Sequence, residues 1–331
     1  MRYERASLSR GLAVGILGGL VVVAATTASA QDYPSRPIRV VVPFSPGGAV
    51  DGPMRIVAQE LSKRLDQQVI VENKPGAGAT LGTEIVARAT PDGYTLMLGY
   101  VATHGTSPAV RKLPYDAVKD FTPIAMVAGT PNILVVPASV PASGLREFVA
   151  WAKSQPGKLS YGSAGAGSLT HLAMEQFKLA ADLPDITHIA YRGIGPAFTD
   201  ILGGQTQAIF PGLAAGLPHI RAGKVKPLAI TGLKRHPLLP EVPTFEELGF
   251  KGFDGVQWYG IVGPAQLPAG IVRRLNEEIN KLLENPELRE RLSGEALEPM
   301  PMSPEQFGQY MRNDITKWTR LAKERNIELT E

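Results

Sequence analysis

Residues 40–55 read VVVPFSPGGAVDGPMR and combine the end of a strand, a glycine turn and the start of a helix. The β-branched run 38–42 is typical of a buried strand. Pro53 suits the first helical turn, where a missing N–H group costs nothing, and we expect Asp51 to be the N-cap. Free backbone N–H groups meet where a strand, a turn and a helix N-terminus join, so this loop is predicted to form half of an anion pocket.

Two further glycine loops follow the same plan of strand, small-residue turn and helix. One spans 72–80, about thirty residues beyond the first, which is a spacing typical of a βαβ unit. The other spans 159–171 and adds hydroxyl side chains. Residues 100–104 follow another predicted strand and form a third candidate wall. We therefore expect a parallel sheet covered by helices on both faces, with the ligand outside the carboxyl ends of its strands.

The first thirty residues have the composition of a secretory signal peptide. Three arginines lie in the first ten positions, and the apolar run 11–25 is shorter than the roughly 20 residues that a membrane span needs. Small residues precede Gln31, so cleavage is predicted after Ala30. An uncleaved membrane anchor is the alternative.

Length and composition limit the class of protein. The 331 residues predict two domains, and 44% hydrophobic with 20% charged residues is ordinary for a globular protein. With no cysteine, the chain has no disulfides to stabilise it. The formal net charge is +3, of which the leader holds +2 in three arginines and one glutamate. No basic run is interleaved with aromatic residues, which argues against nucleic acid as a partner.

The sequence comes close to some common enzyme motifs but lacks a residue that each motif requires. A nucleophile elbow around Ser163 would need glycine at position 161, where Tyr161 stands. Both later glycine loops lack the third glycine of a dinucleotide-binding loop. The histidines show no i,i+4 spacing, so a metal site is unsupported. We expect no catalytic set, no cofactor and no metal; a hydrolase with Ser163 as nucleophile is the remaining enzyme hypothesis.

Three candidate residues have a structural interpretation beside a functional one. His171 either donates to an anion or is simply hydrogen-bonded at a helix start, which we favour. Asp51 would repel an anion if it pointed inward, and the stronger interpretation is an N-cap that orients the loop. Arg192 either pairs bidentately with a ligand carboxylate or lies on the surface or between domains.

Motifs along the whole mature chain resemble those of the Bug family (TctC-like), the periplasmic solute-binding receptors of tripartite tricarboxylate transporters. The matching segments are 42–48 (VPFSPGG) with Asp51, 73–78 (NKPGAG), 91–95 (PDGYT), 113–116 (LPYD), 120–121 (DF), 161–168 (YGSAGAGS) with His171, 191–193 (YRG), 203–205 (GGQ) and 258–260 (WYG). The chain departs from the family pattern at Ser45, where proline is usual, at Ala79, where glycine is common, and at Arg192, where lysine is usual.

The resemblance implies a two-domain α/β fold of the type II periplasmic-binding-protein class, with a ligand cleft that closes like a hinge. We place domain 1 at 31–131 plus 253–331 and domain 2 at 132–252. A carboxylate is expected at the loop 44–48, partly through bridging waters, with the loop 163–168 facing it. The candidate ligand-binding residues are Phe44, Ser45, Pro46, Gly47, Gly48, Asp51, Ala77, Gly78, Thr103, Ser163, Ala164, Gly165, Gly167, Ser168, His171, Arg192 and Phe210.

The function that this resemblance implies is capture of a small carboxylate in the periplasm and its delivery to integral-membrane permease subunits. The receptor is expected to be a monomer without a cofactor. Dicarboxylates, citrate-like acids, aromatic acids, amino acids and nicotinate-like compounds all remain open as ligands. The alternative function is a periplasmic sensor that feeds a membrane histidine kinase.

Overall fold

The computed structural model describes residues 33–47, 50–183 and 185–329. The predicted signal peptide, residues 1–30, and the predicted site residue Gly48 lie outside the described residues. From Pro34 onward the chain forms one compact unit. None of the helices described is both long and apolar enough to cross a membrane.

The first sheet has six strands in the order β11-β4-β10-β3-β1-β2. They are β1 (Ile38–Val42), β2 (Val69–Asn73), β3 (Thr95–Tyr100), β4 (Phe121–Pro131), β10 (Val256–Pro264) and β11 (Glu298–Pro299). β1 pairs in parallel with β2 and β3, as the first two glycine loops predicted. The expectation of a wholly parallel sheet is wrong, because β10 is antiparallel to β3 and β4. β4 carries the chain out of this sheet and β10 brings it back, so the two strands run in opposite directions.

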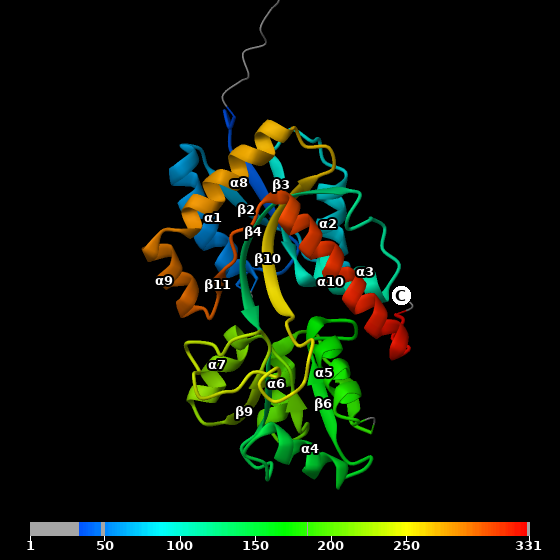
Figure 1. The fold of residues 1–331 in the computed structure, drawn as a ribbon. Coiled ribbons are helices and arrows are strands. Elements are labelled where there is room, and N and C mark those ends of the chain that lie inside the picture. Colours follow the sequence, from blue (N-terminus) through cyan, green and yellow to red (C-terminus); the bar gives the residue numbers. More distant parts are fainter. Residues whose placement is uncertain (1–32, 48–49, 184, 330–331) are drawn as a thin grey trace, which may run out of the picture. The chain divides into compact units, whose positions relative to one another are not determined.

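Helices cover this sheet, and together they form what we call lobe 1 (Figure 1). The helical elements are α1 (Asp51–Leu65), η1 (Ala77–Ala79), α2 (Thr80–Ala87), η2 (Ala102–Thr106), α3 (Ser107–Val110), α8 (Ala269–Leu283), α9 (Pro286–Gly294) and α10 (Pro304–Glu324). The helices α8 and α10 each bury one apolar stripe. Their buried residues, such as Leu275 and Met311, face the core.

The second sheet, with its helices, forms lobe 2. Its strand order is β7-β6-β8-β5-β9. The elements are β5 (Ile133–Pro137), α4 (Leu145–Lys153), β6 (Ser160–Ser163), α5 (Leu169–Ala180), β7 (Thr187–Ala190), α6 (Ile194–Leu202), β8 (Ala208–Ile209), α7 (Leu213–Arg221) and β9 (Val225–Ile230). Apolar clusters lie on both faces, one around Phe148 and Phe177 and the other around Ile201 and Leu217. Burial on both faces explains the continuous apolar run of β5.

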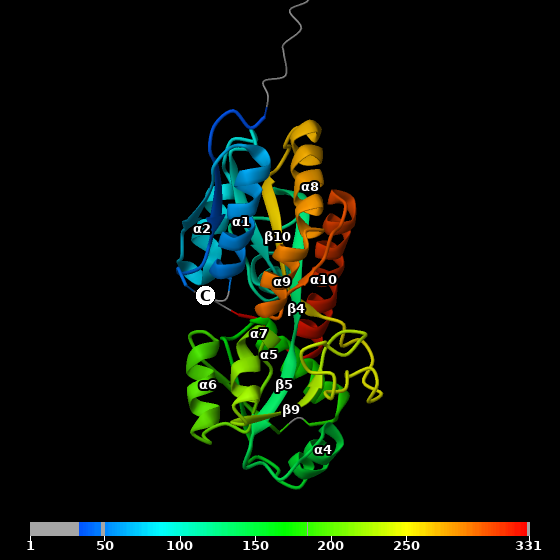
Figure 2. The same ribbon diagram turned by 90° about the vertical axis from the view of Figure 1, so that its left-hand side faces the viewer.

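The chain crosses between the lobes twice, and Thr231 ties the two crossings together. β4 runs almost directly into β5, with Asn132 buried between them (Figure 2). The Asn132 amide donates to the Thr231 hydroxyl at 2.8 Å, and that hydroxyl donates to the Gly255 carbonyl at 2.7 Å. These crossings lie at the predicted domain boundaries; the division into domains at those residues stays a prediction.

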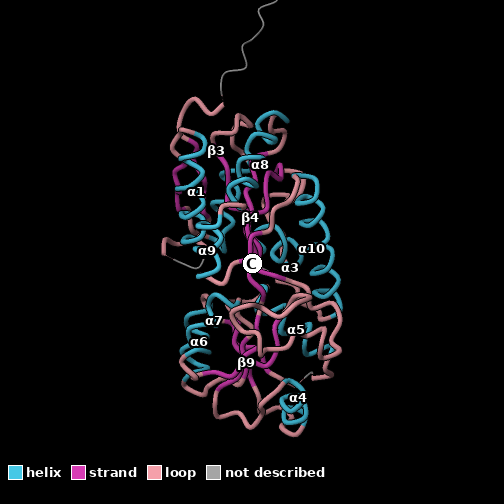
Figure 3. Tube along the Cα trace, turned by 60° about the vertical axis from the view of Figure 1, so that its left-hand side comes forward, coloured by secondary structure: helices cyan, strands magenta, loops and turns pink. Residues whose placement is uncertain are grey.

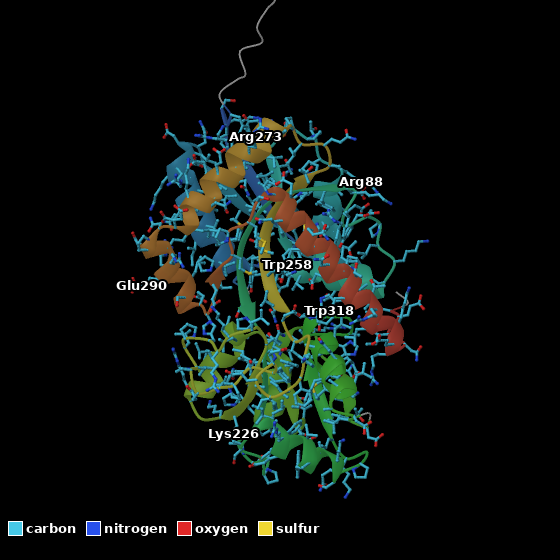
Figure 4. The ribbon with its side chains drawn as sticks, in the orientation of Figure 1. Arg88, Lys226, Trp258, Arg273, Glu290 and Trp318 are labelled. Atoms are coloured by element: carbon cyan, nitrogen blue, oxygen red, sulfur yellow. The ribbon has the colours of Figure 1, made fainter. Side chains whose placement is uncertain are left out.

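Helix α10 also links the lobes. Trp258 on β10 and Trp318 on α10 both donate to the buried Asp314 carboxylate, at 2.9 and 2.7 Å, which fixes the helix to the first sheet (Figure 4). Just beyond the helix, Arg325 makes a 2.7 Å ion pair with Glu175 on α5. The end of the described chain then lies beside α3 (Figure 3), where the Leu329 amide donates to the Val110 carbonyl.

Candidate functional site

Segments from both lobes line a single cavity of about 370 Å³. Its described lining consists of Pro43, Phe44, Ser45, Pro75, Gly76, Gly78, Ala79, Ala102, Thr106, Ser107, Arg111, Ala164, Gly165, Ala166, Gly167 and Ser168. The volume is at the lower end of small-molecule sites, which range from about 300 to 1,000 Å³. The structure thus brings the three predicted glycine loops together, at the carboxyl ends of β1, β2 and β6.

The first loop is held by Asp51, although not as an N-cap. The N-cap is Val50, and Asp51 is the first residue of α1. Its carboxylate reaches back to the loop and accepts hydrogen bonds from the Gly47 amide at 2.9 Å, Arg55 Nε at 2.8 Å and Asn73 Nδ2 at 2.8 Å. The N-cap prediction is therefore wrong, but the loop-orienting role is correct. Asp51 is not among the described residues that line the cavity.

The same contacts control the ionisation of Asp51. Burial alone raises its pKa, but hydrogen bonds from Arg55, Gly47 and Asn73 outweigh that effect and lower the pKa to about 2. The carboxylate therefore stays charged at neutral pH. Its charge is balanced by Arg55 and by two N–H donors, which explains how an acidic residue can lie beside an anion pocket.

The second loop has an unusual backbone. Ala77, Gly78 and Ala79 all have positive φ angles of 45°, 61° and 76°. This left-handed conformation favours glycine, which accounts for the glycine common at position 79 in the resembling family. Gly82 allows a close approach, because a Cβ there would lie 2.7 Å from the Lys74 carbonyl and 2.8 Å from Pro43 Cβ. Helix α2 thus packs directly on the first two loops.

The third loop is organised by its own side chains. Ser168 is the N-cap of α5, and its side chain accepts from the His171 amide. The amides of Ala164, Gly165 and Gly167 donate to Thr170 Oγ1, Ser163 Oγ and His171 Nδ1, respectively. These amides are therefore already paired, contrary to the expectation that they were free for an anion.

At least one amide in each loop remains free among the described residues. No hydrogen bond is made by the backbone N–H of Ser45, Gly76 or Ala166, and all three residues line the cavity. Thus each loop still offers at least one donor. Ser45 is one of the predicted binding residues, whereas Gly76 and Ala166 are not; that such amides anchor an anion stays a prediction.

His171 supports the loop as a neutral side chain. Burial, helped by the neighbouring His188, lowers its pKa to about 4. Its ring stacks on His188 with centroids 3.9 Å apart, and because Nδ1 accepts from Gly167, the proton is on Nε2. The helix-start interpretation is the one that these contacts support.

Ser163 lies beneath the loop. Its hydroxyl is 2.7 Å from His188 Nε2 and 3.1 Å from the Gly165 carbonyl. The side chain is fully buried and is not among the described residues that line the cavity. A buried hydroxyl of this kind shapes the loop and does not reach a substrate.

Other predicted residues lie away from the cavity. Pro46, Gly47 and Arg192 are exposed, and Ala77 lies in the second loop outside the lining. The Thr103 hydroxyl donates to the Tyr100 carbonyl, which turns it from the cavity. Phe210 is core, stacked on Phe245.

The wall that follows β3 was predicted only in part. Ala102 lies within the predicted wall 100–104, whereas the other lining residues of this wall lie beyond it, in η2, in α3 and directly after α3: Thr106, Ser107 and Arg111. η2 is a π-helical turn, a feature frequent at functional sites. A π-turn has no sequence signal that could have placed Thr106 and Arg111 on the cavity side. Among the described residues, no cluster of three or more histidine or acidic side chains could hold a metal ion.

We predict that Asp51→Asn lowers the free energy of unfolding at neutral pH, and that this loss disappears in acid. The folded pKa of Asp51 lies below its unfolded value of about 3.9, so its stabilisation is complete above about pH 4 and disappears as the pH falls toward 2. The loss is about 2 kcal/mol, measured as the free energy of unfolding in urea at pH 2 to 7. Arg55→Gln, which removes one of three donors, should give a smaller loss. Equal pH profiles for wild type and Asp51→Asn would contradict the role of this carboxylate.

We also predict that Gly167→Ala separates the lobes. Both Gly167 and Gly157 have left-handed backbones, with φ of 73° and 71°. An added Cβ has open space at Gly157, whereas at Gly167 it would lie 2.6 Å from Val110 Cγ2 and 2.7 Å from Leu329 Cδ1. Gly157→Ala should cost about 1 kcal/mol of stability. Gly167→Ala should cost more and also increase the radius of gyration in small-angle scattering; equal effects of the two variants would argue against a close contact there.

Comparisons with known proteins agree on one family. The model described as "tripartite tricarboxylate transporter family receptor" matches residues 54–327. Protein BugT of Bordetella pertussis is 34% identical over 327 residues, or 98% of this chain and 99% of BugT. The structure of Rpa4515 from R. palustris with adipate is 32% identical, with a TM-score of 0.81 over 90% of this chain and 99% of that one. MatC from Rhodopseudomonas palustris with bound malate is 34% identical, with a TM-score of 0.76 over 87% and 99%.

These similarities confirm the expected fold class. Periplasmic binding proteins are among the matching structures, and the two-domain α/β fold predicted from the sequence is theirs. The family consists of solute receptors, so the chain is a solute-binding protein and not an enzyme. The hydrolase hypothesis for Ser163 is wrong, in agreement with the burial of its hydroxyl.

Proposed function

Because the chain belongs to the family of tripartite tricarboxylate transporter receptors, we propose that it captures a small carboxylate in the periplasm and delivers it to the permease. The permease consists of integral-membrane subunits of the same transporter. Residues 1–30 act as a signal peptide that is cleaved after Ala30, and the mature receptor works as a monomer without a cofactor.

One observation carries the proposal. The cavity is lined by free amides of Ser45, Gly76 and Ala166 and by no described aspartate or glutamate. Amide N–H groups that converge from loops and helix N-termini favour an anion. Exclusion of water strengthens these hydrogen bonds, because the interaction grows as the effective dielectric constant falls. A carboxylate, with two acceptor oxygens, suits this donor set.

The relatives support the same class of ligand. Two structures that share about a third of their residues with this chain contain adipate and malate, which are both carboxylates. The cavity volume of about 370 Å³ suits acids of that size. Bridging waters complete the contacts where the loops stand back from the ligand.

Closure of the two domains completes the site. In this proposal domain 1 (31–131 plus 253–331) and domain 2 (132–252) rotate about the two crossings tied by Thr231. The third loop belongs to domain 2 and the other linings to domain 1, so an acid bound between them stabilises the closed state. A carrier of this kind releases its acid when the permease favours the open state.

A thermal-shift screen of the mature protein against a panel of carboxylates, followed by calorimetry, tests capture. An acid that binds only the folded protein should add about 2.7 kcal/mol of stability at 100 times Kd, a rise of a few degrees in Tm. The matched control is the amide of each acid, which keeps its size and removes its charge; it should give no shift. Capture is refuted if folded protein, freed of co-purified ligand, gives no shift with any acid.

Delivery has its own test. Proteoliposomes that contain the permease subunits should accumulate a radiolabelled acid only when the receptor and a driving ion gradient are present. The Gly167→Ala receptor, whose domains should close poorly, is expected to support slower uptake than Gly157→Ala. Uptake at the same rate without receptor would rule out the delivery role and leave the sensor function as the alternative.

A further inference from the structure

We propose that Arg111 binds a second carboxylate, so that the acid held in this cavity is a dicarboxylate. The inference rests on the proposed carboxylate-binding function and names the substrate class. One carboxylate of the ligand is held by the loop amides, and the other pairs with the guanidinium of Arg111.

Arg111 is the one charged side chain among the described residues that line the cavity. No ion pair or side-chain hydrogen bond joins it to any described residue. It also borders a neighbouring cavity that includes Glu328, and the two side chains make no ion pair. An arginine is always charged in proteins, so this cation has no counter-charge until a ligand brings one.

Two buried polar atoms in the same wall lack partners. Arg111 Nε and Thr106 Oγ1 are both shielded from solvent, and neither makes a hydrogen bond. Buried polar groups are nearly always paired, since leaving one unpaired costs about 1–3 kcal/mol. Both unpaired atoms belong to residues that line the cavity, and a ligand carboxylate is a partner that would satisfy them. The Nε and Nη groups of an arginine fit the two oxygens of a carboxylate side by side.

Arg111 lies beside the second loop, and hydrogen bonds fix its main chain there. A Cβ at Gly78 would lie 3.1 Å from Arg111 Nη1, so the absence of a side chain at Gly78 makes room for the guanidinium beside the second loop. The Arg111 amide donates to the Ser107 carbonyl at 3.1 Å, and the preceding residue accepts from Leu329. Because the main chain is fixed at this point, the Arg111 side chain stays at the cavity, where it can recognise a terminal carboxylate.

A dicarboxylate is the ligand that occupies both kinds of anchor. A monocarboxylate at the loop amides leaves Arg111 without a counter-charge in a closed, water-poor cavity, which is unfavourable. A monocarboxylate at Arg111 leaves the loop amides unpaired. Only an acid with carboxylates at both ends satisfies the whole lining.

Calorimetry with matched acid pairs tests this inference. The probes are adipate with hexanoate, succinate with butanoate, and phthalate with benzoate, where the second acid of each pair lacks one carboxylate. Wild type should bind at least one diacid about 10- to 100-fold more tightly than its monoacid, the range for a hydrogen bond to a charged group. Arg111→Gln should remove this preference and change monoacid affinity less than twofold.

Two further variants make the test specific. Lys112→Gln removes the same charge one residue away, from an exposed side chain outside this cavity, and should keep the diacid preference. Arg111→Lys keeps the charge but loses the bidentate geometry, so an intermediate preference is expected. It also preserves the test if Arg111→Gln fails to fold, which circular dichroism would reveal.

The outcomes separate the inference from the proposed function. If diacids and monoacids bind wild type equally, or if Arg111→Gln weakens both alike, the second-carboxylate site is wrong while carboxylate capture stands. If no acid binds the folded wild type, the proposed function fails and the inference fails with it. Loss of the diacid preference in Lys112→Gln would show a general charge effect and would also overturn the assignment.

Discussion

The binding site depends on the buried carboxylate of Asp51. It accepts hydrogen bonds from Gly47, Arg55 and Asn73, and Asn73 also donates to the Phe44 carbonyl, so one side chain fixes the ends of β1 and β2 and the loop between β1 and α1. Loss of the carboxylate would remove all three of these hydrogen bonds at once, and bonds to a charged acceptor are stronger than those between neutral groups. A negative charge thus organises an anion site because its own charge is already balanced.

The rest of the site extends this arrangement with few additional charges. In the third loop, hydroxyl and imidazole groups accept hydrogen bonds from the loop's own amides. These bonds keep the loop rigid and leave the amide of Ala166 as its free donor. Thr231 and the Arg325–Glu175 pair connect the lobes that carry the loops. Arg111 then stands out as an uncompensated cation in a lining of small and hydroxyl residues. Such a site can change its ligand through a few side chains while the backbone anchors stay the same.

The sequence predicted repeated and local features. It missed features that depend on the direction in which a strand runs or a side chain points in the folded protein. The three strand-turn-helix units were readable from the order of apolar runs, glycine turns and helix starts in the sequence. The antiparallel β10 was not, because strand direction follows from where the chain returns after lobe 2. Asp51 was misassigned as an N-cap because its carboxylate turns back to Gly47. Thr103 was chosen over Thr106 and Arg111 because a π-turn shifts which side chains face the cavity.

The most direct test of this account is a crystal structure of the mature protein with the tightest-binding acid from the carboxylate panel. The account predicts one carboxylate within about 3 Å, directly or through one water, of the amides of Ser45, Gly76 and Ala166. It predicts the opposite carboxylate beside Arg111 Nε. Ligand density outside this cavity, or an acid bound there whose oxygens meet none of these amides, would contradict it.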